Sequence, residues 1–231
     1  RQTKRIIESS FNTTVDQLFD MIEERATASG AIAQVHRAKL KGKDEWVAVK
    51  VRHPGVSEAI TRDLSIIYYV SRIVDRMETF AWLNLRENIL SFSRNMRAQT
   101  DLNIEARSLK QFANNFKFIP TVIFPKPIMH NSNVLIESYE TGESVTHYIN
   151  GDYDSALRSR IASLGTNMFL KMMFVDNLVH ADLHPGNILV RMNESNNSPS
   201  LVVLDTGMMS SLGPIDRQNF IDLFSAIIAG K

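Results

Sequence analysis

Apolar residues recur along this chain at two spacings, and each spacing predicts a different kind of element. A spacing of three and four residues predicts amphipathic helices. These are expected at residues 14–24, 57–77, 85–116 and 155–177. Short or alternating apolar runs rich in β-branched residues predict strands. These are expected at residues 31–40, 45–52, 134–136, 188–190 and 201–204, with a hairpin turn at residues 41–44.

The order of these elements predicts an α+β chain with two lobes. Residues 1–139 are the expected N-lobe, a small β-sheet with long helices, and residues 140–231 are the expected C-lobe, which is mostly helical and carries a hairpin. The first residue is Arg1 rather than Met, and the last residues follow an apolar stretch that resembles a helix in progress. We therefore expect an excised piece of a longer chain with a truncated C-lobe.

Composition excludes several classes of protein. A hydrophobic fraction of 44% with 22% charged residues, 10 Gly and 7 Pro excludes disordered and collagen-like chains. The 26 basic and 25 acidic side chains provide no broad electrostatic surface for nucleic acid, so no nucleic-acid partner is expected. The absence of cysteine excludes disulfides, thiolate metal sites and a cysteine nucleophile. No apolar run is long enough to predict a membrane span.

The strongest chemical signal is the segment at residues 180–187, His-Ala-Asp-Leu-His-Pro-Gly-Asn, which is followed at the end of the next predicted hairpin by Asp205. Phosphoryl transfer from ATP needs a carboxylate near the acceptor and oxygen ligands for a metal ion. Asp182 would orient or deprotonate the acceptor, while Asn187 and Asp205 would hold Mg²⁺ against the phosphates. The plainer alternative is a turn that binds nothing, because turns favour the same residue types.

A lysine in the middle of a predicted strand is the second signal. Lys50 shares its face of the strand with Ala48, and valines occupy the other face. An unpaired ammonium in a lobe interior costs several kcal/mol, so Lys50 needs a counter-charge or a phosphate. We expect Glu105 to be its ion-pair partner and Ala48 to leave room for a flat base. The plainer alternative is an edge-strand lysine whose ammonium reaches solvent.

Lys50, the loop at residues 180–187 and the Asp205-Thr206-Gly207 segment match the motif set of protein-kinase-like proteins. The glycine-rich loop of protein kinases is missing, because Gly30 stands there alone among small residues. With that difference, the chain resembles the UbiB (AarF-domain) atypical kinase family from about Val15 to Leu223. Four segments carry the resemblance: 28–38 (ASGAIAQVHRA), 47–56 (VAVKVRHPGV), 101–106 (DLNIEA) and 180–190 (HADLHPGNILV).

This resemblance implies a two-lobed protein-kinase-like fold that binds ATP or ADP with Mg²⁺. Lys50 and Glu105 correspond to the nucleotide lysine and its helix partner, and Asp182, Asn187 and Asp205 take the catalytic-loop and metal roles. The resemblance also implies two further groups that contact nucleotide. The first is the family's alanine-rich loop, which is associated with restrained protein-kinase activity and corresponds to Ala28, Ser29, Gly30 and Ala31. The second is the backbone of Glu137, Ser138 and Tyr139, which would contact adenine.

The chain departs from the family pattern in three places. The family's Glu-x-Asp motif reads Gln99-Thr100-Asp101 here, so a carboxylate has become an amide. No Lys-x-Gly-Gln segment, which in the family packs over the active site, occurs in this sequence. Thr206 stands where protein kinases usually have Phe, which removes an aromatic contact and keeps the metal ligand.

Three functions fit these residues. The first is an ATP-dependent atypical kinase or ATPase, of weak activity, linked to ubiquinone or isoprenoid lipid metabolism. The second is a nucleotide-binding regulatory pseudokinase with little turnover, which the alanine-rich loop and Gln99 favour. The third is a small-molecule kinase of the aminoglycoside and choline type, which has a similar catalytic loop but against which segments 28–38 and 101–106 argue.

The resemblance also implies partners and a compartment. Nucleotide, proteins of the lipid or isoprenoid-quinone pathway and a peripheral membrane contact are the expected partners. Mitochondrial residence is expected from the eukaryotic members of the family, while plastid and bacterial members share the same motifs.

Overall fold

The computed structural model describes residues 2–75 and 84–230. They divide into two compact units. The first unit contains the residues up to Arg107 together with Lys126–Tyr139, and the second contains Ser108–Pro125 and the residues from Glu140 onward. Helix α5 (Leu102–Asn115) begins in the first unit and ends in the second.

The first unit is built on a six-stranded antiparallel sheet with the order β1-β3-β4-β7-β6, in which β2 pairs with β3. Its strands are β1 (Phe19–Ile22), β2 (Ala28–Ser29), β3 (Ala33–Leu40), β4 (Trp46–Arg52), β6 (Pro127–His130) and β7 (Val134–Ser138). The accompanying helices are α1 (Gln2–Phe11), α2 (Val15–Leu18), α3 (Val56–Val74) and α4 (Leu85–Gln99).

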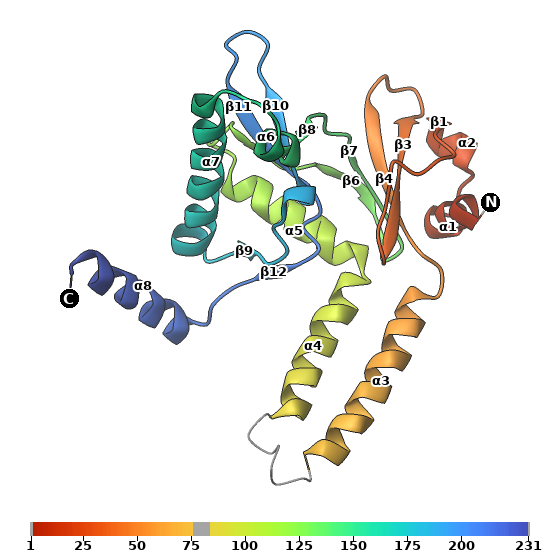
Figure 1. Cartoon of the computed structure of the whole chain (residues 1–231). Coiled ribbons are helices and arrows are strands. Elements are labelled where there is room, and N and C mark those ends of the chain that lie inside the picture. Colours follow the sequence, from red (N-terminus) through yellow and green to blue (C-terminus); the bar gives the residue numbers. More distant parts are fainter. Residues whose placement is uncertain (1, 76–83, 231) are drawn as a thin grey trace. The chain divides into compact units, whose positions relative to one another are not determined.

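Strand β4 has the two faces that its alternation predicts. Val47, Val49 and Val51 are almost fully buried in a core that includes Ile7 of α1, so α1 covers this face of the sheet. Lys50 therefore points to the opposite face. Helices α3 and α4 pack against each other as a helical hairpin (Figure 1).

The helix predicted at residues 14–24 is wrong in its second half. Only Val15–Leu18 is helical, and Phe19–Ile22 forms the edge strand β1. Val15 and Phe19 are both buried in the same core, and Phe19 pairs with Leu40 of β3. Pairing with the sheet thus overrides a helical spacing that the sequence also satisfies.

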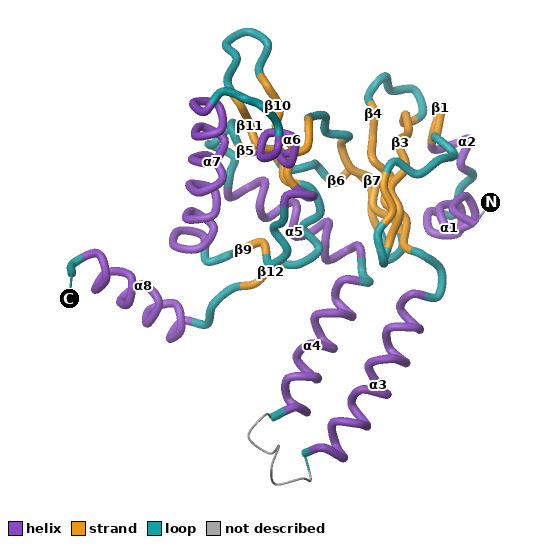
Figure 2. Tube along the Cα trace, in the orientation of Figure 1, coloured by secondary structure: helices purple, strands orange, loops and turns teal. Residues whose placement is uncertain are grey.

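The single helix predicted at residues 85–116 is two helices, α4 and α5, with a loop between them (Figure 2). The guanidinium of Arg52 donates a 2.6 Å hydrogen bond to the carbonyl of Thr100, which anchors the break to β4. The carboxylate of Asp101 accepts the N–H of Asn103 at 3.0 Å and so caps the start of α5. The helix predicted at 57–77 is observed as Val56–Val74, and its last two predicted residues lie outside the described residues.

The second unit holds a four-stranded sheet and a two-stranded ladder. The order of the larger sheet is β5-β11-β10-β8, with β5 and β11 parallel, and the ladder pairs β9 with β12. The strands are β5 (Val122–Ile123), β8 (Glu143–Ser144), β9 (Val179–His180), β10 (Ile188–Met192), β11 (Pro199–Val203) and β12 (Met209–Ser210). The helices are α6 (Val145–Asn150), α7 (Ser155–Leu170), α8 (Pro214–Ile228) and a short 3-10 turn, η3 (Pro185–Asn187).

The helix predicted at residues 155–177 changes its winding near its end. Helix α7 packs against β11 and continues as a π-helical turn, η2 (Lys171–Asp176). It ends at Asn177, which has a left-handed backbone conformation (φ 49°). The wider turn and the left-handed residue direct the chain into β9.

Residues 108–125 pack with the second unit. Strand β5 pairs with β11, and the rings of Phe112 and Phe124 stack with their centroids 5.3 Å apart. The division into lobes at residue 139 stays a prediction, and the compact units differ from it in this stretch. Residues 108–125 fall in the second unit because β5 pairs with β11, a strand that lies far along the chain.

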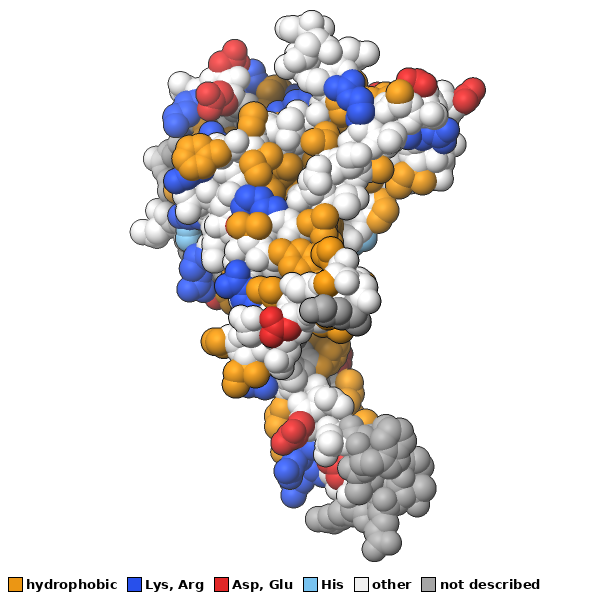
Figure 3. All heavy atoms as spheres, turned by 90° about the vertical axis from the view of Figure 1, so that its left-hand side faces the viewer, with side chains coloured by type: hydrophobic (Ala, Val, Ile, Leu, Met, Phe, Trp, Pro, Cys, Tyr) orange, Lys and Arg blue, Asp and Glu red, His pale blue; other side chains and the backbone are white. Residues whose placement is uncertain are grey.

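Helix α8 exposes much of its apolar surface, including Ile215, Ile227 and Ile228. Apolar side chains are visible on this side of the molecule (Figure 3). None of the described helices combines the length and the apolar character needed to span a bilayer.

Candidate functional site

Lys50 and Glu105 form the ion pair that the sequence predicts. The Nζ of Lys50 lies 2.8 Å from Oε1 of Glu105, and the side chains are 13% and 5% exposed. Strand β4 places Lys50 on the face opposite the valines, and the first turn of α5 supplies Glu105. The alternative of a lysine whose ammonium reaches solvent is therefore wrong.

Ala48 lies two residues before Lys50 on the same strand and is 8% exposed. It is paired with Arg37 on β3 and with Glu137 on β7, so it sits between both neighbouring strands. A residue without side-chain bulk at this position leaves the face beside Lys50 flat, as the sequence-based hypothesis of a base-binding surface requires.

The alanine-rich segment forms strand β2 (Ala28–Ser29) and the start of the tight turn that leads to β3. Ala28, Ser29, Gly30 and Ala31 are all exposed, and the N–H of Gly30 donates to the carbonyl of Ala33 at 2.9 Å. A Cβ built on Gly30 would meet only that carbonyl oxygen, at 3.8 Å. The turn therefore needs no glycine for its own geometry, and its N–H at Gly30 is already used.

Glu137, Ser138 and Tyr139, the predicted adenine contacts, lie at the end of β7 and just beyond it. The N–H of Ser138 donates to the carbonyl of Lys126 at 3.0 Å, and the N–H of Tyr139 donates to the carbonyl of Trp46 at 3.2 Å. Because the sheet uses both donors, a base here would meet carbonyl oxygens or N–H groups that follow Tyr139.

The residues of the predicted catalytic loop, 180–187, lie in the second unit and are held by hydrogen bonds within the loop. The N–H of Asp182 donates to Nδ1 of His180 at 3.2 Å, which assigns the proton of the neutral imidazole to Nε2. His180 is 2% exposed and packs beside the ring of Phe112. The side-chain N–H of Asn187 donates to the carbonyl of Asp182 at 3.2 Å, so the amide oxygen of Asn187 takes no part in this bond.

Asp205 follows β11 and has a left-handed backbone conformation (φ 49°), which residues other than Gly, Asn and Asp rarely adopt. Its carboxylate accepts the N–H of Gly207 at 3.2 Å. The N–H of Leu204 donates to the carbonyl of Asn187 at 2.8 Å. The β10–β11 hairpin therefore brings Asn187 beside the residue that precedes Asp205.

The donors at this place suit Mg²⁺ bound together with phosphate. Within the described residues, no group of three or more His, Asp or Glu side chains is placed to hold a metal ion. Asn187 and Asp205 supply one amide and one carboxylate, and Mg²⁺ in phosphoryl-transfer sites is commonly held by one or two such oxygens plus phosphate and water. Their fit to Mg²⁺ thus depends on a bound nucleotide.

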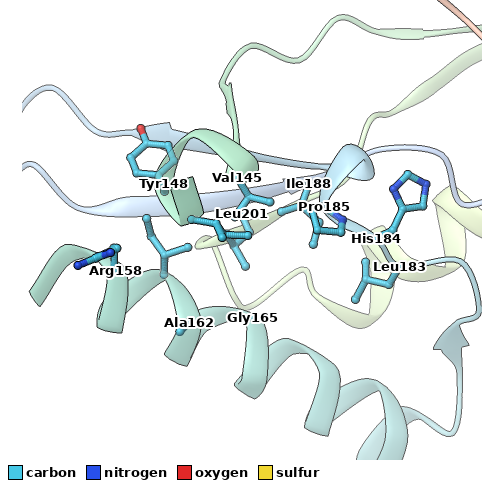
Figure 4. Close-up of a pocket in the computed structure, with 12 residues that line it drawn as sticks. Val145, Tyr148, Arg158, Ala162, Gly165, Leu183, His184, Pro185, Ile188 and Leu201 are labelled. Atoms are coloured by element: carbon cyan, nitrogen blue, oxygen red, sulfur yellow. The ribbon is translucent and has the colours of Figure 1, made fainter. Parts of the chain in front are cut away.

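An apolar pocket of about 490 Å³ lies beneath the predicted catalytic loop in the second unit. Leu183 and Pro185 of the loop form one wall, and Ala162 and Gly165 of α7 form the opposite wall (Figure 4). Arg158 stands at one end and His184 at the other (Figure 4). His184 is turned toward its own loop, where its Nδ1 accepts the N–H of Gly186 at 3.1 Å.

Sequence reasoning missed two arrangements beside these residues. The guanidinium of Arg37 lies 3.7 Å from the ring centroid of Trp46 and 5.0 Å from that of Tyr139. Lys171 and Asp176 form an ion pair in η2. A strand register that places Arg37 opposite Ala48 would have indicated the first, but no spacing in the sequence indicates a π-helical turn.

Solved structures show the fold. The Rv3197–erythromycin complex from Mycobacterium tuberculosis matches with a TM-score of 0.76 at 21% identity, covering 91% of this chain and 51% of that one. The Rio2 kinase–ADP/Mg²⁺–phosphoaspartate complex from Chaetomium thermophilum matches with a TM-score of 0.52 at 14% identity, covering 88% and 52%. The predicted kinase-like fold is confirmed.

Curated relatives are similar over nearly the whole chain. The probable serine/threonine-protein kinase abkC of Dictyostelium discoideum is 33% identical and covers 99% of this chain. The mitochondrial ABC1 family protein YPL109C of Saccharomyces cerevisiae is 29% identical over 92%, and the probable protein kinase UbiB of Vibrio cholerae is 29% identical over 97%. This chain spans 42% of the length of each of them.

The resemblance to UbiB proteins that the motifs indicated is thus confirmed by these relatives. A family model described as the ABC1 atypical kinase-like domain matches residues 1–231. The chain belongs to the ABC1 atypical kinase-like family.

Proposed function

We propose that this protein is an ATP-dependent atypical kinase or ATPase. The observation that carries the proposal is the buried ion pair between Lys50 and Glu105, at 2.8 Å. In protein kinases this pair must be in place for phosphoryl transfer, together with the metal-binding aspartate. A lysine that served only solubility would not be held at 13% exposure against a carboxylate.

Each site residue then has a defined task. Glu105 fixes the ammonium of Lys50, which would bind a phosphate oxygen. Asp182 would orient the acceptor hydroxyl or water and take its proton, and its loop is kept in shape by the bonds to His180 and Asn187. Asn187 and Asp205 would hold Mg²⁺, which when bound neutralises charge on the phosphates.

We further propose a link to ubiquinone or other isoprenoid lipid metabolism, with residence in mitochondria. The relatives named UbiB and the relatives named as mitochondrial support it. Proteins of that pathway and a peripheral contact with the membrane are the partners that follow from this proposal.

The test is nucleotide binding with and without Mg²⁺, followed by thermal shift. We expect ATP to raise the melting temperature more with Mg²⁺ than without it. Asp205→Asn keeps the residue shape and the tolerance for a left-handed backbone, so it should fold normally and lose only the Mg²⁺-dependent part of the shift. Equal shifts for Asp205→Asn and the unaltered chain would reject the metal role.

A second candidate is a regulatory module that binds nucleotide with little turnover. The hydrogen bonds that occupy the N–H groups of Gly30, Ser138 and Tyr139 favour it, because fewer backbone donors remain for phosphates and base. Nucleotide binding without measurable ATP consumption, even with added lipid or detergent, would support this candidate over the first.

A further inference from the structure

The catalytic loop and the metal segment of the second unit are joined directly after a π-helical turn. Strand β9 leads into Asp182, and β12 follows Asp205 within a few residues. The two strands pair, with His180 opposite Met209, and the N–H of Ala181 donates to the carbonyl of Met208 at 3.0 Å. The placement of this small ladder therefore sets where the loop of Asp182 begins and where the loop of Asp205 ends.

The turn η2 that precedes the ladder is closed by an ion pair. The Nζ of Lys171 lies 2.6 and 2.7 Å from the two carboxylate oxygens of Asp176, and these side chains are 21% and 9% exposed. Side chains that meet on an α-helix are three or four residues apart, whereas these are five apart, which suits the wider π turn. The ammonium also lies 4.6 Å from the ring centroid of Phe116.

Asn177 connects the turn to the far side of the ladder. Its amide donates to the carbonyl of Leu212 at 2.9 Å, and its amide oxygen accepts the N–H of Leu212 at 3.2 Å. Leu212 follows β12, so the two bonds bind the residue that ends η2 to the segment behind Asp205. Arg217 of α8 adds bonds to the carbonyls of Phe174 and Val175 in the same turn, at 3.3 and 3.2 Å.

We propose that Lys171, Asp176 and Asn177 are positioning residues that hold the loop of Asp182 and the loop of Asp205 in one fixed arrangement. A π turn is a local departure from regular helix, and such turns are found frequently at functional sites. Here the Lys171–Asp176 ion pair stabilises the π-helical turn, and this turn ends at Asn177 in its left-handed conformation. The bonds of Asn177 to Leu212 then fix the loop of Asp205 relative to the loop of Asp182.

Two variants separate this role from general stability. Lys171→Met removes the ammonium that pairs with the carboxylate of Asp176, a side chain that is 9% exposed. Asn177→Gly removes both bonds to Leu212 and keeps a residue that adopts the left-handed backbone easily, so it should fold even if Lys171→Met does not. The matched control is Arg191→Met, which breaks another ion pair of the second unit, between Arg191 and Glu140 at 2.6 Å.

The first measurement is amide hydrogen exchange, which does not depend on activity. In Lys171→Met and Asn177→Gly we expect the amides of residues 178–187 and 205–213 to exchange at least about tenfold faster, while those of β10 and β11 change by the global loss of stability alone. Arg191→Met should not accelerate the two loops selectively. Uniform acceleration across the second unit, or no acceleration, would overturn the proposal.

The second measurement rests on the proposed function. We expect both variants to lower the rate of ATP consumption about tenfold or more and to leave the affinity for nucleotide without Mg²⁺ within about twofold. If the unaltered chain consumes no ATP, the proposed function fails while the exchange result still decides the positioning role. Selective loop exchange with an unchanged rate of ATP consumption would contradict the catalytic part of the inference.

Discussion

Replacing Lys50 by methionine tests whether the Lys50–Glu105 pair is a desolvated ion pair. Methionine is similar in length and fits the same space without a charge. The substitution leaves the carboxylate of Glu105, which is 5% exposed, without its ammonium partner. Removing one partner of a buried pair costs about 3–5 kcal/mol, whereas replacing both partners by apolar residues is often neutral or stabilising. Because Lys50 keeps 13% exposure, we expect about 3 kcal/mol for Lys50→Met.

The assay is thermal and urea unfolding of three variants: Lys50→Met, Glu105→Leu and the double variant. For a chain of this size, a loss of 3 kcal/mol lowers the melting temperature by about 6–12 °C. Lys50→Met combined with Glu105→Leu should recover most of that loss, which makes the two substitutions strongly non-additive. Lys50→Met and the double variant should both lose nucleotide binding, because neither has the ammonium.

The control is Lys39→Met. Lys39 lies 2.6 Å from Asp44, closer than Lys50 lies to Glu105, but the side chain of Asp44 is 97% exposed. Solvent screens an exposed pair, so this substitution should have a small effect on stability. If Lys50→Met is no more destabilising than Lys39→Met, or if the double variant loses as much stability as the single one, the reasoning from burial is refuted.

Three further predictions concern the turn, the cap and a tyrosine. Gly30→Ala should leave the free energy of unfolding unchanged or raise it by up to about 1 kcal/mol, because Gly30 has no positive φ and an added Cβ would have room. Reduced ATP affinity in a fully stable Gly30→Ala variant would show that phosphates approach this backbone. Asp101→Ala should lower the unfolding free energy by about 1 kcal/mol in urea denaturation, because α5 loses the bond to the N–H of Asn103, while Asp101→Asn should lose much less. Burial, with a contribution from the Glu143 carboxylate, raises the pKa of Tyr148 to about 12. The folded state therefore disfavours the tyrosinate, and the stability present below pH 10 falls as pH rises toward 12. The absorbance of tyrosinate should show a late-titrating tyrosine that Tyr148→Phe removes. Persistence of this titration in Tyr148→Phe would contradict the assignment.

Much of the candidate site could be predicted from sequence because its signals are local. The alternation of β4 assigned Lys50 to the face opposite the valines, and the loop pattern at residues 180–187 placed Asp182 and Asn187 next to a hairpin that leads to Asp205. A lysine within a strand needs a counter-charge. Glu105 was the carboxylate chosen for that role, the family resemblance implied the same residue, and the structure shows the pair.

The tertiary structure alone decided the features in which two local preferences compete. Phe19 satisfies a helical spacing, but pairing with Leu40 places it in a strand. The break at Thr100 exists because Arg52, far away in sequence, binds its carbonyl, and the π turn at Lys171–Asp176 is closed by an ion pair whose spacing no regular helix would favour. The sequence by itself predicted which residues would carry the chemistry, because motif spacing and strand alternation are written within a few residues. The structure decided how those residues are held, because that depends on contacts between segments whose separation along the chain contains no periodic signal.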